Sequence, residues 1–134
     1  MADSPISVSI ERETDIVVAR QKGRALAAAL GFSTTDQTLL ATAISEIARN
    51  IVSYAGTGHV ALVVAAEGGR RGIIVTATDS GPGIPDIELA LRDGYSTGNS
   101  LGAGLPGAKR LMDDFEIQSS PGVGTTVTMK KWLR

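Results

Sequence analysis

The chain has 134 residues, which fits one domain spanning residues 1–134, and its net charge of −1 argues against binding to nucleic acid. It has no cysteine, which excludes disulfides, cysteine-ligated zinc and thiol catalysis. No apolar run approaches the roughly 20 residues that span a bilayer, and the N-terminus lacks a signal peptide's apolar stretch, so we expect a soluble cytoplasmic protein without membrane association.

The N-terminal half of the chain predicts one strand followed by two helices. Apolar and polar residues alternate from Ile6 to Ile10, as in a half-buried strand. The pattern becomes helical from Thr14 to Leu30, where Gly31 provides a plausible stop. A second helix is expected from about Asp36 to Ala55, with apolar residues at a spacing of three to four.

The C-terminal half predicts two hairpins with helical segments between them. The expected elements are strands over residues 60–65 and 72–78, a short helix over 86–92, a candidate mobile lid over 94–104, a helix over 105–115, and strands over 116–120 and 125–132. Because hairpins dominate, we expect an α/β fold. Its architecture is a two-layer sandwich, in which a mixed, mostly antiparallel sheet carries helices on one face.

The first chemical motif is Glu46-x-x-x-Asn50 in the second predicted helix. Residues four apart share one helix face, so the carboxylate and the amide lie together. An asparagine oxygen suits Mg2+, and a glutamate one turn away can deprotonate an attacking hydroxyl. We therefore predict Glu46 as a catalytic base and Asn50 as a metal ligand, although such a pair alone is common on solvated helices. The adjacent Arg49 either contacts phosphates or pairs at the surface.

The second motif is the turn Asp79-Ser-Gly-Pro-Gly83, which follows an apolar strand. A carboxylate at this place can accept a hydrogen bond from an exocyclic amine such as that of adenine, and Gly81 and Gly83 let a flat base approach the backbone. An ordinary turn would have the same composition. Residues 122–126 either form only the last hairpin turn or bring Thr126 to the same side of the base.

The third motif, residues 102–107, spells G-x-G-x-x-G at the start of a predicted helix, where amides and the helix dipole bind phosphate. A dinucleotide fold needs an acidic residue about 20 positions later, but Val127 stands there. A P-loop continues with lysine, but Ala108 follows Gly107. Eukaryotic-type protein kinases need downstream motifs that are absent. We therefore predict a phosphate loop of another kind.

These motifs, in this order, resemble the GHKL ATPase family over about residues 34–130. Within it the chain is most similar to the small bacterial anti-sigma-type serine/threonine kinases, above all the switch kinases of the stressosome. The stretches that carry this resemblance are residues 42–50, 79–86, 94–97 and 101–113.

The resemblance implies a Bergerat ATP-binding fold that uses ATP and Mg2+. It also implies phosphorylation of STAS-domain scaffold or antagonist proteins and direct activation of a serine phosphatase. With Glu46 as the base and Asn50 as the metal ligand, the residues predicted to bind the nucleotide are Asn50, Arg49, Asp79, Gly81, Gly83, Ile84, Ser96, Thr97, Gly102, Ala103, Gly104, Leu105, Gly107 and Thr126.

One feature departs from the family pattern. Residues 93–108 contain no lysine or arginine, so the phosphate charge must be met by Mg2+, by lid amides, or by Arg49 or Lys109. Two other functions stay open. The chain could be an anti-sigma binding module with secondary kinase activity. It could also be the catalytic half of a histidine kinase, which the lack of a phosphoacceptor histidine on a dimerisation helix disfavours.

Overall fold

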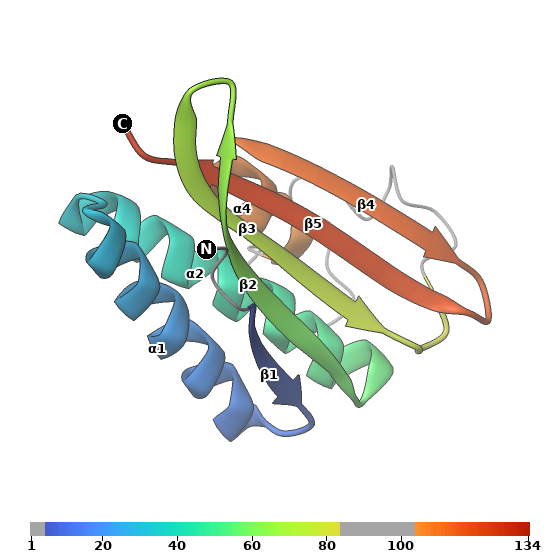
Figure 1. Cartoon of the computed structure of the whole chain (residues 1–134). Coiled ribbons are helices and arrows are strands. Elements are labelled where there is room, and N and C mark those ends of the chain that lie inside the picture. Colours follow the sequence, from blue (N-terminus) through green and yellow to red (C-terminus); the bar gives the residue numbers. More distant parts are fainter. Residues whose placement is uncertain (1–4, 84–103) are drawn as a thin grey trace.

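The computed structural model describes residues 5–83 and 104–134 (Figure 1). The helix predicted over residues 86–92 lies outside these ranges, as does the lid predicted over 94–104 except for its last residue, Gly104. The described elements are β1 (Ile6–Ile10), α1 (Glu13–Leu30), α2 (Thr34–Asn50), the π-helical turn η1 (Ile51–Ala55), β2 (Gly58–Glu67), β3 (Arg70–Asp79), α4 (Gly104–Leu111), β4 (Asp114–Ser120) and β5 (Gly124–Trp132). None of the helices in the described ranges is long and apolar enough to cross a membrane.

The five strands form one sheet in the order β1-β2-β3-β5-β4, and the helices lie on one side of it (Figure 1). This confirms the predicted α/β two-layer sandwich. The prediction of a mixed sheet is wrong for the described strands, because all four neighbouring pairs are antiparallel. The reason is that β5 lies between β3 and the edge strand β4. It runs antiparallel to both, so β3 and β4 have the same direction but are not neighbours.

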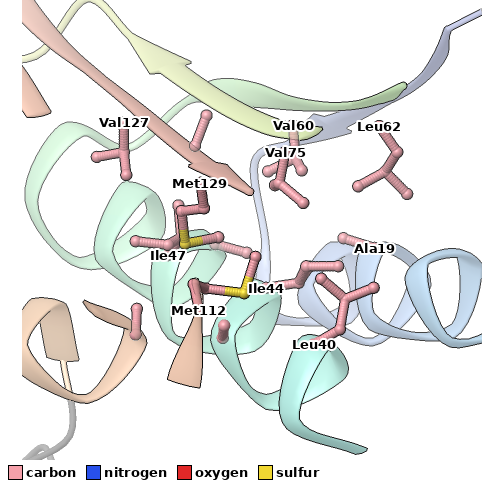
Figure 2. Close-up of a cluster of buried hydrophobic side chains, with 14 of the residues drawn as sticks. Ala19, Leu40, Ile44, Ile47, Val60, Leu62, Val75, Met112, Val127 and Met129 are labelled. Carbon is pink, nitrogen blue, oxygen red and sulfur yellow. The ribbon is translucent and has the colours of Figure 1, made fainter. Parts of the chain in front are cut away.

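The core lies between the sheet and α2, which packs between α1 and α4. Leu40, Ile44 and Ile47 of α2 point toward the sheet, as their spacing predicted (Figure 2). The opposing side chains come from alternate positions of three strands, and they are Val60, Leu62, Val75, Val127 and Met129. This two-residue alternation decides which strand residues face the helices and which face the other side of the sheet.

The α1 helix approaches α2 closely because its buried face is made of small residues, Ala19, Gly23 and Ala27. A Cβ added at Gly23 would lie 2.2 Å from Cδ1 of Ile44. The end of α1 and the start of α2 largely follow the signals in the sequence. α1 stops before Gly31, as predicted, but α2 starts earlier than expected because Ser33 provides the cap, accepting a hydrogen bond from the Asp36 amide at 3.1 Å.

Two predicted helices end earlier than expected. The α-helix predicted to reach Ala55 stops at Asn50 and continues as η1, a wider π-turn of a kind that often marks functional sites. α4 ends at Leu111, and Phe115 instead belongs to β4, where it pairs with Met129. There Phe115 and Ile117 pack against the core from alternate positions, so tertiary burial overrides local helical propensity.

Ile44→Ala should lower the free energy of unfolding by about 2–5 kcal/mol, because this side chain is 0% exposed and a cavity would remain beneath the sheet. Val18→Ala on the exposed face of α1 is the control and should change stability by less than about 0.5 kcal/mol. Urea unfolding followed by circular dichroism measures both. Equal losses in the two variants would contradict this description of the core.

Candidate functional site

Helices α2 and α4 meet at Glu46. Its Oε2 atom accepts a hydrogen bond of 2.7 Å from the backbone N–H of Gly104, the first residue of α4, and its side chain is only 12% exposed. The first amides of a helix have no partner within the helix, so they bind acceptors from elsewhere. The predicted base and the start of the predicted phosphate-binding helix are therefore in direct contact, although they lie 58 residues apart in sequence.

Arg49 takes the second of its two predicted positions. Its Nη1 atom lies 2.8 Å from Oε1 of Glu46, one turn earlier on the same helix. The guanidinium is half exposed, and such a pair contributes at most about 1 kcal/mol to stability. The structure thus pairs Arg49 with Glu46, and its predicted contact with phosphates stays a prediction. Both carboxylate oxygens of Glu46 are engaged as a result.

Asn50 is the last residue of α2 and lies one turn beyond Glu46, at the junction with η1. Its side chain is partly buried and makes no capping hydrogen bond to η1, so the amide oxygen is not used by the helix end. Across residues 5–83 and 104–134, no group of three histidine, aspartate or glutamate side chains could hold a metal. A single amide oxygen fits Mg2+ when substrate oxygens and waters complete its shell.

The turn after β3 is built around Asp79. Its Oδ1 atom accepts a hydrogen bond of 2.8 Å from the Gly81 amide. A Cβ on Gly81 would lie 2.6 Å from Cβ of Ala55, so this glycine lets the turn pack against η1. Gly83 has φ +81° and would place a Cβ 2.4 Å from the Ser120 carbonyl. These glycines therefore admit the protein's own chain, a reason that the sequence did not reveal.

The other side of the same turn is held by the loop between β4 and β5. The Gly122 amide donates a hydrogen bond of 2.7 Å to the carbonyl oxygen of Pro82. The Asp79 turn is thus fixed between η1, which continues the helix of Glu46 and Asn50, and the loop that precedes β5. The helix that carries Glu46 and Asn50, the Asp79 turn and the loop before β5 therefore meet at one end of the sheet.

Thr125, and not Thr126, shares a sheet face with Asp79. The register pairs Asp79 with Thr125 and Thr78 with Thr126, and directly opposed residues project to the same face. Thr126 therefore projects to the face away from the helices, so the register favours Thr125 over Thr126 as the neighbour of the Asp79 carboxylate, and nucleotide binding by Thr126 stays a prediction. Thr125 is 7% exposed, and its hydroxyl oxygen lies 2.9 Å from Oγ of Ser119.

The sequence did contain the signal for Thr125. Val127 and Met129 are apolar and alternate, and extending their two-residue period backwards reaches residue 125. A hollow of about 360 Å³ lies beside this position, and Asp79 and Thr125 are among its lining residues. Thr78, Gln118 and Thr126, which the register places on the opposite sheet face, line it as well. The lining is rich in hydroxyl and amide groups, which suits a polar ligand.

The remaining predicted residues divide into two groups. Gly104, Leu105 and Gly107 belong to the first turn of α4, where Leu105 packs into the core and leaves only its backbone for a ligand. Lys109 is exposed on the same helix. The other group lies outside the described residues and consists of Ile84, Ser96, Thr97, Gly102 and Ala103.

Comparison with known proteins agrees with this arrangement. Residues 35–134 match the family described as histidine kinase-, DNA gyrase B-, and HSP90-like ATPase. The chain belongs to this ATPase family. The predicted GHKL fold is thereby confirmed, and membership implies binding of ATP. The match includes Glu46, Asn50 and the Asp79 turn.

Relatives narrow the assignment within the family. The chain is 54% identical to the serine/threonine-protein kinase RsbT of Bacillus subtilis, over 95% of this chain and 96% of that protein. It is 33% identical to the anti-sigma F factor of Bacillus licheniformis, over 73% of this chain and 70% of that protein. These matches confirm the predicted resemblance to anti-sigma-type kinases and the predicted enzyme class, a protein serine/threonine kinase.

Solved structures support the fold alone. The RsbU and RsbW domains from Mycobacterium tuberculosis superpose with a TM-score of 0.69 at 20% identity, covering 98% of this chain and 33% of that one. The mycobacterial sensor histidine kinase MprB superposes with a TM-score of 0.58 at 16% identity, covering 100% of this chain and 99% of that one. The architecture is thus shared at identities of 20% and below.

Thr125→Val should weaken ATP binding by about three- to tenfold, the value of one hydrogen bond, because valine keeps the shape and removes the hydroxyl. Thr76→Val is the matched control, since it makes the same change on β3 outside the hollow, and it should bind ATP like the parent. Thr126→Val, on the opposite sheet face, should lose less affinity than Thr125→Val. Titration calorimetry measures the three affinities. A larger loss in the Thr126 variant would restore the original prediction.

Proposed function

We propose that this chain is an ATP-dependent kinase that phosphorylates serine or threonine on STAS-domain scaffold or antagonist proteins of the stressosome. It then binds and activates a serine phosphatase in the general stress response, acting as a single cytoplasmic domain over residues 1–134. The observation that carries the kinase chemistry is the contact between Glu46 and the Gly104 amide, which brings a base to a phosphate-binding helix start. The 54% identity to a serine/threonine kinase supports the protein substrate.

Each part of the site has a distinct task in this proposal. Bound Mg-ATP supplies the phosphoryl group and the divalent charge. Asp79 accepts a hydrogen bond from the amino group of the base, and Thr125 adds a hydroxyl beside it on the same sheet face. Asn50 would give the cation one oxygen ligand, and the first amides of α4 would face the phosphates. In phosphoryl transfer the protein contributes mainly such positioning and charge stabilisation.

Glu46 changes partners in this scheme. The structure engages one of its oxygens with Gly104 and the other with Arg49. A phosphate oxygen that accepts the Gly104 N–H would release the first oxygen and leave it facing the substrate hydroxyl. Glu46 then takes the hydroxyl proton as the oxygen bonds to phosphorus and ADP departs. Arg49 keeps the carboxylate oriented throughout.

A second function, an anti-sigma binding module with secondary kinase activity, is favoured by the 33% identity to an anti-sigma F factor. The two functions differ in where label from ATP goes. Incubation with γ-labelled ATP and a candidate STAS-domain protein should label that protein on serine or threonine. Stable binding of a sigma subunit without labelling of any STAS protein would favour the second function.

Glu46→Gln should retain ATP affinity and reduce phosphoryl transfer by about 10²–10⁴-fold, because the amide keeps the size and removes the base. Glu67→Gln makes the same chemical change at the exposed hairpin between β2 and β3, and it should transfer label like the parent. Single-turnover transfer to the STAS protein measures both. A Glu46→Gln rate within about threefold of the parent would exclude Glu46 as a base of that typical magnitude.

Asn50→Ala should abolish the effect of Mg2+ on ATP affinity, because alanine has no oxygen for the cation. Calorimetric titration with ATP, in Mg2+ and in excess chelator, measures the effect. The parent should bind at least about tenfold more tightly with Mg2+, whereas the variant should bind equally in both conditions. A folded variant that kept the parent's response to Mg2+ would remove Asn50 from the metal site.

A further inference from the structure

Lys131 is a charged residue in the core-facing row of β5. It is 4% exposed, whereas its neighbour Lys130 projects to the other face and pairs with Glu67 at 3.2 Å. A buried ammonium costs several kcal/mol unless it is paired and hydrogen-bonded. Both conditions are met here. Its Nζ atom donates a hydrogen bond of 2.8 Å to the Leu111 carbonyl and lies 3.9 Å from Oδ1 of Asp36.

These two partners belong to the helices that build the candidate site. Leu111 is the last residue of α4, where carbonyl groups lack helical partners and the helix dipole is negative. Asp36 lies in the first turn of α2. Lys131 therefore joins β5, α4 and α2 at one end of the helix pair, while the bond from Gly104 to Glu46 joins α4 and α2 at the other end.

The turn after α4 is fastened to the same part of β5. The Trp132 backbone amide donates to Oδ2 of Asp113 at 2.7 Å, and its indole Nε1 donates to Oδ2 of Asp114 at 2.9 Å. These bonds hold the chain after the helix, and Lys131 holds the helix end itself. Since α4 has only eight residues, about 12 Å of rise, a displacement at its C-terminus moves its N-terminal amides by a similar amount.

We propose that Lys131 is a positioning residue for the phosphates of the nucleotide. It fixes α4 along its axis, and it thereby sets the place of the Gly104 amide beside Glu46. This inference rests on the proposed function in one respect, namely that the start of α4 faces phosphate. Lys131 contacts the C-terminus of α4, yet it should affect the binding of the phosphates of ATP and not that of its base.

The test compares ATP with adenosine, which has the base and no phosphates. Lys131→Met keeps a similar volume and removes the charge. It should weaken ATP binding at least about tenfold while leaving adenosine affinity within about twofold of the parent. Lys130→Met is the matched control one residue earlier and should change neither affinity. A merely structural role for Lys131 would weaken both ligands together or lower only the melting temperature.

The outcomes separate this inference from the proposed function. If the parent binds ATP no better than adenosine, the phosphate site at α4 is wrong whatever Lys131 does. If the parent prefers ATP and Lys131→Met keeps that preference, or loses both ligands equally, the positioning role is wrong. If Lys131→Met does not fold, Asp36→Asn decides, because it leaves the bond to Leu111 and weakens only the second anchor. A reduced ATP preference supports the role, and an unchanged one overturns it.

Discussion

The candidate site depends on how α2 is held between the sheet and its neighbouring helices. Ile44 and Ile47 are buried against the strands, and this burial fixes the rotation of the helix about its axis (Figure 2). The helical period then places Glu46 and Asn50 together at the border of the core, where side chains are partly shielded from water. A rotation that exposed either isoleucine would cost about 1.5–3 kcal/mol and would also move Glu46, the proposed base. Packing and catalytic geometry are therefore set by the same contacts.

Two further segments reach the site through backbone contacts. The Asp79 turn packs against η1 at Gly81 and against the loop before β5 at Gly83, so the turn is held from both sides, and the Gly81 amide donates to its carboxylate. α4 reaches the site through the amide of Gly104. The close approach of the neighbouring chain accounts for glycine at positions 81 and 83, whereas Gly104 has a φ of +45°, a backbone conformation that favours glycine. The site is thus assembled from elements along one end of the sheet, with the proposed base Glu46 and the proposed metal ligand Asn50 on α2 and the Asp79 carboxylate at the end of β3.

Much of this organisation was predictable from the sequence because it depends on local periodicity. The apolar stripe of α2, the hairpin between β2 and β3 and the spacing of Glu46 and Asn50 all follow from residues close together in the chain. What the sequence analysis missed depends on partners distant in sequence. Phe115 joins β4 because it packs against the core, and the side of the sheet that Thr125 faces follows from the pairing of β5 with β3. The burial of Lys131 required knowledge of where α4 ends.

In the proposed mechanism, Glu46 and a bound phosphate compete for the Gly104 amide. Nuclear magnetic resonance of the ¹⁵N-labelled protein observes this amide directly, before and after saturation with Mg2+ and a non-hydrolysable ATP analogue. The account predicts that the Gly104 resonance moves substantially on saturation, while that of Gly31 at the end of α1 stays in place. It also predicts that Glu46→Gln shifts the Gly104 resonance in the protein without nucleotide. Saturated binding that left the Gly104 resonance unchanged would contradict the account.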